Sequence, residues 1–216
     1  MEELERLRQW VMIRLDELKP GIEPAAPVIG LERELDEAAL FILRHASREI
    51  VLEACVDATE PVVVKQERCV KVGVPADFVR FMRIRLKGWR SDVNWLTGVQ
   101  TPIYTEQSNE YTASTASAPI ASIVPWRHKV GEKVFTRAIE CYPGSSVQIE
   151  QFLYVPKLTA VEMPDVLKDP LVWLTASRVF QLMREGDLSQ LAMQRFGSTL
   201  NTVKLGILGE ENVEAQ

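Results

Sequence analysis

The spacing of apolar residues changes twice along this chain, and that change limits the possible folds more than any other feature. Near both ends, apolar residues recur every three or four positions, as they do on one face of an amphipathic helix. Between residues 61 and 156 this period disappears, and short β-branched runs alternate with clusters of glycine, proline, serine and asparagine. The sequence therefore predicts helical ends around a central β region.

Four helices are predicted, at residues 2–18, 31–56, 170–185 and 187–207. Asp169 and Pro170 are typical of a helix start, because a carboxylate caps free N–H groups and proline fits the first helical position. Gly186 is predicted to separate the last two helices. Each helix has an apolar stripe that must be buried. The predicted fold class is therefore α+β: a helical bundle of the N- and C-terminal helices with a small antiparallel β-sandwich or barrel inserted.

The predicted domain bounds follow the same change of period. Residues 1–60 and 157–208 are assigned to the helical bundle, residues 61–156 to the β module, and residues 209–216 to a flexible polar tail. The strand candidates lie at 62–64, 69–72, 82–87, 103–104, 122–124, 134–135, 137–140 and 146–155. The polar stretch at 107–117 is predicted to be a mobile loop or a polar hairpin.

Composition argues against several classes of function. The formal net charge is -5, whereas proteins that grip nucleic acid concentrate positive charge. Cys55, Cys69 and Cys141 are widely spaced and form no CxxC pair, so we expect reduced thiols and neither a disulfide framework nor a zinc site. His45 is predicted on a helix surface and His128 in a solvated loop. We expect no catalytic, metal or cofactor site, and therefore no enzyme.

The first residues and the hydropathy pattern predict where the protein is found. Glu2, Glu3 and Glu5 lie where a secretion signal needs positive charge. No apolar run approaches the roughly 18 residues of a membrane span. We therefore expect a protein that stays in the cytoplasm in which it is made and has no membrane partner.

Alternation of apolar and basic residues marks one strand candidate. Met82, Ile84 and Leu86 are predicted on the buried face, with Arg83, Arg85 and Lys87 on the outer face. Three interpretations of this basic stripe remain open. It is a solvated face, a nucleic-acid contact, or one side of a subunit interface. In the last case, the acidic residues Glu32, Glu34 and Glu37 of the second helix are candidates for the opposite side.

Several short segments resemble a known family. They are VPADFVR at 74–80, followed by a strand and Gly88-Trp89; Tyr104 with Gln107 and Asn109 before a Ser/Thr/Ala-rich stretch; FLYVP at 152–156; MPD at 163–165; and PLVWLTA at 170–176. With the order of helices and strands, they resemble head-to-tail adaptor (connector) ring proteins of short-tailed bacteriophages, including the ring proteins of crAss-like phages. The resemblance covers about residues 31–195.

The resemblance implies a structural virion protein without an active site. Its expected partners are its own copies in a ring of twelve subunits, the portal protein above, tail or ring proteins below, and genomic DNA passing through the channel. Such a protein is made and assembled in the cytoplasm of the host bacterium and resides in the virion. The alternative is a nucleic-acid-binding module that uses the basic strand from Arg83 to Lys87.

Overall fold

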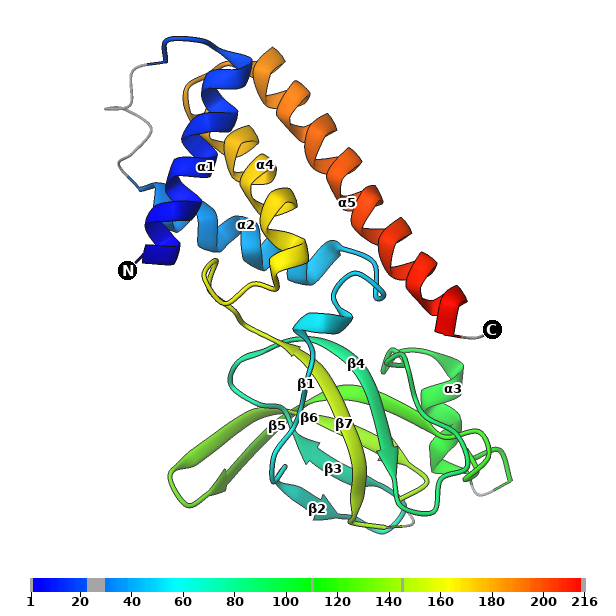
Figure 1. The fold of residues 1–216 in the computed structure, drawn as a ribbon. Helices are drawn as coiled ribbons and strands as arrows, with labels where there is room; N and C mark the ends of the chain where they lie inside the picture. The colour runs from blue at the N-terminus through cyan, green and yellow to red at the C-terminus, as the bar shows by residue number, and fades with distance from the viewer. Residues whose placement is uncertain (1, 23–29, 110, 145, 215–216) are drawn as a thin grey trace. The chain divides into compact units, whose positions relative to one another are not determined.

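The computed structural model describes residues 2–22, 30–109, 111–144 and 146–214 (Figure 1). The fold is mixed α+β as predicted, with helices at both ends of the chain and two antiparallel sheets in the inserted part. The chain divides into two compact units, residues 1–54 with 157–216 and residues 55–156. The first boundary lies a few residues before the predicted one, because Val56 and Asp57 pair with a strand of the β unit.

In its described part, the helical unit consists of four α-helices packed around one of them, α4 (Asp165–Leu182). The other three are α1 (Glu2–Leu18), α2 (Leu31–His45) and α5 (Gly186–Glu214). Helix α4 packs against α1, α2 and α5, and Figure 1 shows it between α1 and α5. Every residue from 170 to 177 is buried, so α4 has no solvent face there. Within the described residues, no helix is both long enough and apolar enough to cross a membrane.

Helix α2 is shorter than predicted. It ends at His45 because Ala46 is extended, with φ −62° and ψ 159°. A turn follows, in which the Val51 N–H donates to the Ser47 carbonyl (3.3 Å), and then the 3₁₀ turn Leu52–Ala54. The prediction of a helix to residue 56 was wrong. The turn buries Ala46, Ile50 and Ala54, whose spacing of four residues is also that of a helix face.

Helix α4 begins five residues before the predicted start. Its N-cap is Pro164, with ψ 144°, and Pro170 lies inside the helix. The prediction from Asp169 and Pro170 was wrong. A proline in the second turn removes one N–H donor, the one that would bond the Val166 carbonyl. Burial of the apolar run from 170 to 177 offsets that loss.

The break between α4 and α5 is made by Arg184 rather than by Gly186. Arg184 adopts the left-handed conformation, with φ 62°. The Glu185 N–H then donates to the Phe180 carbonyl (2.9 Å), the six-to-one bond that closes a Schellman motif. Gly186 is the first residue of α5. That helix continues to Glu214, through the predicted polar tail, and residues 215 and 216 lie outside the described residues.

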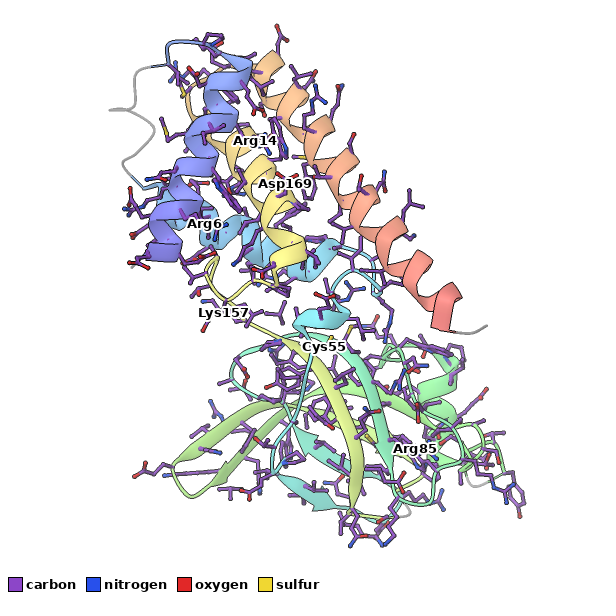
Figure 2. The ribbon with its side chains drawn as sticks, in the orientation of Figure 1. Arg6, Arg14, Cys55, Arg85, Lys157 and Asp169 are labelled. Atoms are coloured by element: carbon purple, nitrogen blue, oxygen red, sulfur yellow. The ribbon has the colours of Figure 1, made fainter. Side chains whose placement is uncertain are left out.

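Ion pairs join the helices at several places. The Arg14 guanidinium lies 3.0 Å from the Asp169 carboxylate, and Figure 2 shows these residues close together on α1 and α4. The same guanidinium lies over the ring of Trp173, 4.9 Å from its centroid. Trp173 is 6% exposed and belongs to the core of the helical unit.

The β unit consists of two antiparallel sheets. One has the order β1-β7-β4 and the other β2-β3-β6-β5. The strands are β1 (Val56–Asp57), β2 (Val63–Lys65), β3 (Val70–Gly73), β4 (Phe78–Leu86), β5 (Ile120–Val130), β6 (Lys133–Tyr142) and β7 (Ile149–Pro156). Both sheets contribute side chains to one core, which includes Val72, Phe81, Ile139 and Phe152. This shared core is typical of a small sandwich.

Three local predictions in the β unit need correction. Residues 103–104 lie in the short helix α3 (Pro102–Thr105), with Pro102 at its first position, and not in a strand. The candidates at 134–135 and 137–140 are parts of the single strand β6. His128 lies in strand β5, with its ring stacked 4.5 Å from that of Trp126, and not in a loop.

The polar stretch at 107–117 contains a buried glutamine. Gln107 is 4% exposed; its amide nitrogen donates to the Ile103 carbonyl (2.7 Å), and its amide oxygen accepts from the Ser114 N–H (2.8 Å). These bonds tie the described part of the stretch to α3. Its mobility in solution stays a prediction.

Candidate subunit interface

The basic stripe on β4 has the predicted orientation. Met82, Ile84 and Leu86 are buried, whereas Arg83 and Arg85 are half-buried and Lys87 is exposed. Both arginines have acidic partners in the same unit. Asp92 lies 3.5 Å from Arg83 and 3.3 Å from Arg85, and Glu150 lies 2.9 Å from Arg85. These pairs neutralise much of the stripe, which reduces its attraction for an anionic partner.

The acidic candidates on α2 also have partners within their own unit. Glu32 pairs with Arg8 of α1, and Glu34 lies 2.7 Å from Arg178 of α4. Glu37 pairs with Arg178 and, at 2.9 Å, with Arg33; its hydrogen bond to Arg33 is the first cause of a lowered carboxyl pKa. These carboxylates join α2 to its neighbours. They belong to a different unit from the stripe, and their role in an interface stays a prediction.

Helix α5 has an apolar stripe that is only partly covered. Ala192 is fully buried and Phe196 is 9% exposed, but Leu200, Val203 and Ile207 further along are half-buried. Helix length explains the difference. Helix α4 has 18 residues and α5 has 29, so they span about 27 and 44 Å. Part of α5 therefore extends past α4 and leaves apolar side chains available to another surface (Figure 1).

A second apolar surface of the helical unit lies between α1 and α4. Trp10, Ile13 and Val172, with the paired Arg14 and Asp169, line a groove of about 290 Å³. Ile13 is 53% exposed. The groove and the α5 stripe are different surfaces of one unit, one concave and one convex.

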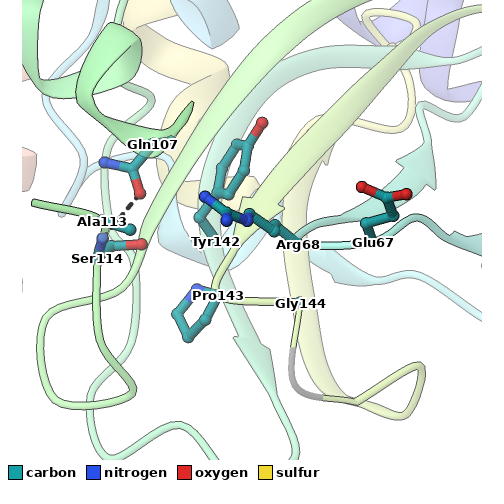
Figure 3. A pocket seen from close by; sticks show the side chains of 8 residues that line it. All are labelled: Glu67, Arg68, Gln107, Ala113, Ser114, Tyr142, Pro143 and Gly144. Carbon is teal, nitrogen blue, oxygen red and sulfur yellow. Dashed lines mark hydrogen bonds between the residues drawn. The ribbon is translucent and has the colours of Figure 1, made fainter. Parts of the chain in front are cut away.

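A polar cleft lies in the β unit. A cavity of about 800 Å³ is lined by Gln66, Glu67, Arg68, Cys69, Tyr104, Thr105, Gln107, Glu140 and Tyr142. A smaller cavity of about 270 Å³ shares Glu67, Arg68, Gln107 and Tyr142 with it. Figure 3 shows the smaller cavity, with the bond from Ser114 to Gln107 on one wall and Tyr142 and Pro143 on the other.

The charged centre of this cleft is Glu140, which is 6% exposed. Its carboxylate lies 3.4 Å from the Lys71 ammonium and accepts hydrogen bonds from the Tyr104 hydroxyl (2.5 Å) and the Cys69 thiol (3.5 Å). A buried carboxylate is tolerated when it is paired and hydrogen-bonded in this way. The cluster is therefore satisfied internally.

The cleft keeps the Cys69 thiol and the Tyr104 phenol in their protonated forms. Burial, followed by the Glu140 charge, raises the pKa of the Cys69 thiol to about 11. Burial and the hydrogen bond to Glu140 raise the pKa of Tyr104 to about 12, and burial also raises the pKa of the Cys141 thiol. A nucleophilic cysteine needs the opposite shift, so this arrangement does not activate either thiol. Within the described residues, no three His, Cys, Asp or Glu side chains are grouped as metal ligands would be.

The raised pKa of Cys69 predicts a pH dependence of stability. In the unfolded chain the thiol loses its proton near pH 9, but in the folded protein it keeps the proton up to about pH 11. The unfolded state therefore binds fewer protons in that window, and the free energy of unfolding should fall as pH rises from about 9 to about 11. Urea unfolding at several pH values measures this slope. The Cys69→Ser variant should show a shallower slope, and equal slopes in both proteins would contradict the assignment.

Sequence reasoning missed both the polar cleft and the groove between α1 and α4. One signal for the cleft was present. Glu140 is a single carboxylate between Ile139 and Cys141, in a strand that is otherwise apolar there. A charged residue in such a run indicates a buried partner. The groove had no comparable signal, because Trp10 and Ile13 read as ordinary members of an amphipathic helix.

No protein-family model matches the chain, and a search of curated proteins finds no similar sequence.

Proposed function

We propose that this protein is a structural subunit of a head-to-tail connector ring in the virion of a short-tailed bacteriophage. The observation that carries the proposal is the pair of different apolar surfaces on the helical unit, the α5 stripe and the groove between α1 and α4. The family resemblance of residues 31–195 supports it. In this proposal the ring has twelve copies, lies between the portal protein and the next tail or ring protein, and surrounds the genomic DNA.

A closed ring needs a heterologous contact, in which each subunit offers two unlike faces. The α5 stripe of one subunit, formed by Leu200, Val203 and Ile207, fills the neighbour's groove beside Trp10 and Ile13. An apolar helix face laid in a groove is a common recognition mode. Together with the sides of the β unit, we expect the contact to bury more than about 2,000 Å², which is typical of stable assemblies.

The alternative function, nucleic-acid binding through the strand from Arg83 to Lys87, has less support. Its two arginines already pair with Asp92 and Glu150. No observation on that strand favours it over the ring.

The experiment measures the mass of the purified protein by sedimentation velocity over a range of concentrations. The wild type should assemble into a ring. Leu200→Lys with Val203→Lys should shift the protein toward monomer by roughly a hundredfold in concentration, about 3 kcal/mol, because two charges enter an apolar contact. Ile13→Lys changes the groove side of the same contact, and it should also shift the protein toward monomer.

A matched control places the same two charges on the exposed side of the same helix. Asn201→Lys with Thr202→Lys should leave assembly unchanged, since both side chains are exposed. Circular dichroism melts of all variants test that the monomer stays folded. A wild type that remains monomeric at every concentration, or equal assembly by the stripe variant and its control, would overturn the proposed interface.

A further inference from the structure

The β5–β6 hairpin forms an arm, residues 125–137, whose residues are all exposed or half-buried. Figure 1 shows it extending past the other strands of its sheet. The pairs His128–Phe135, Lys129–Val134 and Val130–Lys133 continue the ladder to a two-residue turn, where Gly131 has a φ of 59°. No residue from 125 to 137 is buried. A structured arm without a core function is a surface for contact with something else.

The arm carries more cations than carboxylates. Arg127 and Lys129 lie two residues apart on β5 and share one face of the hairpin, whereas Lys133 is paired with Val130 and lies on the other face, next to the turn. Arg137 and the single carboxylate of Glu132 complete the charged residues of the arm. Within the described part of the chain, Arg127, Lys129 and Lys133 take part in no ion pair or side-chain hydrogen bond. Arg83 and Arg85 of β4, by contrast, are paired. On a chain with a formal net charge of -5, this arm is a local positive surface.

Aromatic contacts hold the arm in position. The ring of Trp126 stacks on His128 at 4.5 Å and lies 6.1 Å from that of Phe135. Phe135 in turn lies against Gly73, where an added Cβ would come within 2.6 Å of its ring. Because these rings fix the hairpin against its own sheet, the cations are presented without a large loss of conformational entropy on binding.

The arm does not suit pairing with a strand of another chain. β5 is the edge strand of its sheet, and an open edge normally invites strand addition. Here the edge carries Pro125, and the register shifts between Pro125 and His128. A proline and a bulge both interrupt a ladder, so backbone pairing is blocked and the charged side chains remain for the contact.

We infer that the β5–β6 arm binds the phosphate backbone of double-stranded DNA through Arg127 and Lys129 on one face of the hairpin and Lys133 on the other face, beside the turn. The rings of Trp126 and Phe135 are half-buried and packed together, so they are not free to stack on bases, and the contact should not depend on base sequence. This site differs from the β4 stripe. It does not require the ring, because each subunit carries a complete arm.

The test is DNA binding by the full-length protein, followed by fluorescence anisotropy of a short labelled duplex between about 50 and about 200 mM salt. Three phosphate contacts should give a log–log slope of affinity against salt of about -2.7. Arg127→Gln with Lys129→Gln should reduce the slope to about -1 and weaken binding about tenfold or more at the lowest salt. A single strand of the same length should bind no tighter than the duplex.

The matched control removes two arginines from the other basic surface. Arg83→Gln with Arg85→Gln should change affinity by less than about threefold, because these side chains are already neutralised. Melting temperatures of both double variants show whether either has unfolded. The inference is overturned if the wild type binds no duplex at low salt, or if the arm variant binds like the wild type. It is also overturned if the arm variant self-associates more while DNA binding is unchanged. That last result would mean that the cations only keep copies of the protein apart by charge repulsion.

Discussion

Replacing Trp173 by alanine should lower the free energy of unfolding by about 3–5 kcal/mol, the usual cost of truncating a large buried aromatic. Trp173 is 6% exposed in the middle of α4, the helix that contacts the other three helices of its unit. The change leaves a cavity beside α1 and also removes the surface on which the Arg14 guanidinium rests. Urea unfolding followed by far-UV circular dichroism measures the loss.

Trp95 is the control for this prediction. It is 73% exposed, so Trp95→Ala should change stability by less than about 0.5 kcal/mol. The two tryptophans differ in burial and not in size. A loss below about 1 kcal/mol for Trp173→Ala would show that the helical unit does not depend on this side chain for its core.

Gly144→Ala should destabilise the β unit by about 3 kcal/mol, at the upper end of the range for overpacking. A Cβ at this position would lie 2.4 Å from the carbonyl carbon of Cys69 and 2.7 Å from its Cα. These are backbone atoms, and β3 follows directly, with Val70 paired to Cys141, so the chain cannot move aside easily. The Gly144 N–H also donates to the Arg68 carbonyl (2.8 Å), a bond that any shift would weaken.

A glycine elsewhere in the chain should respond in the opposite direction. Gly197 lies inside α5, and an added Cβ would meet nothing within 4 Å. Gly197→Ala should therefore stabilise the protein by about 0.5–1 kcal/mol, since alanine loses less backbone entropy than glycine in a helix. Denaturation of both variants measures the difference. The same sign of effect for the two substitutions would contradict the close approach of Gly144 to the backbone of Cys69.

Boundaries were less predictable than the existence of the elements. The prediction of α1 was correct at both ends, because its apolar stripe stops just before Pro20 and Gly21. The end of α2 and the start of α4 were wrong, since a buried turn imitates a helix and a proline was tolerated inside one. Burial of a whole segment can override the local preference on which a cap or proline signal rests.

In the candidate site, too, the local pattern predicted one property and the tertiary structure decided another. The outward orientation of Arg83 and Arg85 followed from period two and was correct. Their neutralisation by Asp92 and Glu150 could not be read from the same pattern, because it depends on a turn and on a strand far away in the chain. As a consequence, cations that form no ion pair in the described part of the chain lie on the β5–β6 arm and not on β4, where the sequence pattern indicated a basic surface.

By itself, the sequence determined the class of fold and the division into helical ends and a β insert, because hydrophobic period is a local property that each segment carries alone. Only the tertiary structure decided which ionised groups are neutralised, which apolar stripe is left uncovered, and that Glu140 is buried with Lys71, Tyr104 and Cys69. The physical reason is distance. Coulomb attraction, hydrogen bonding and burial act between atoms a few ångströms apart, and residues 71 and 140 become neighbours only when β3 pairs with β6.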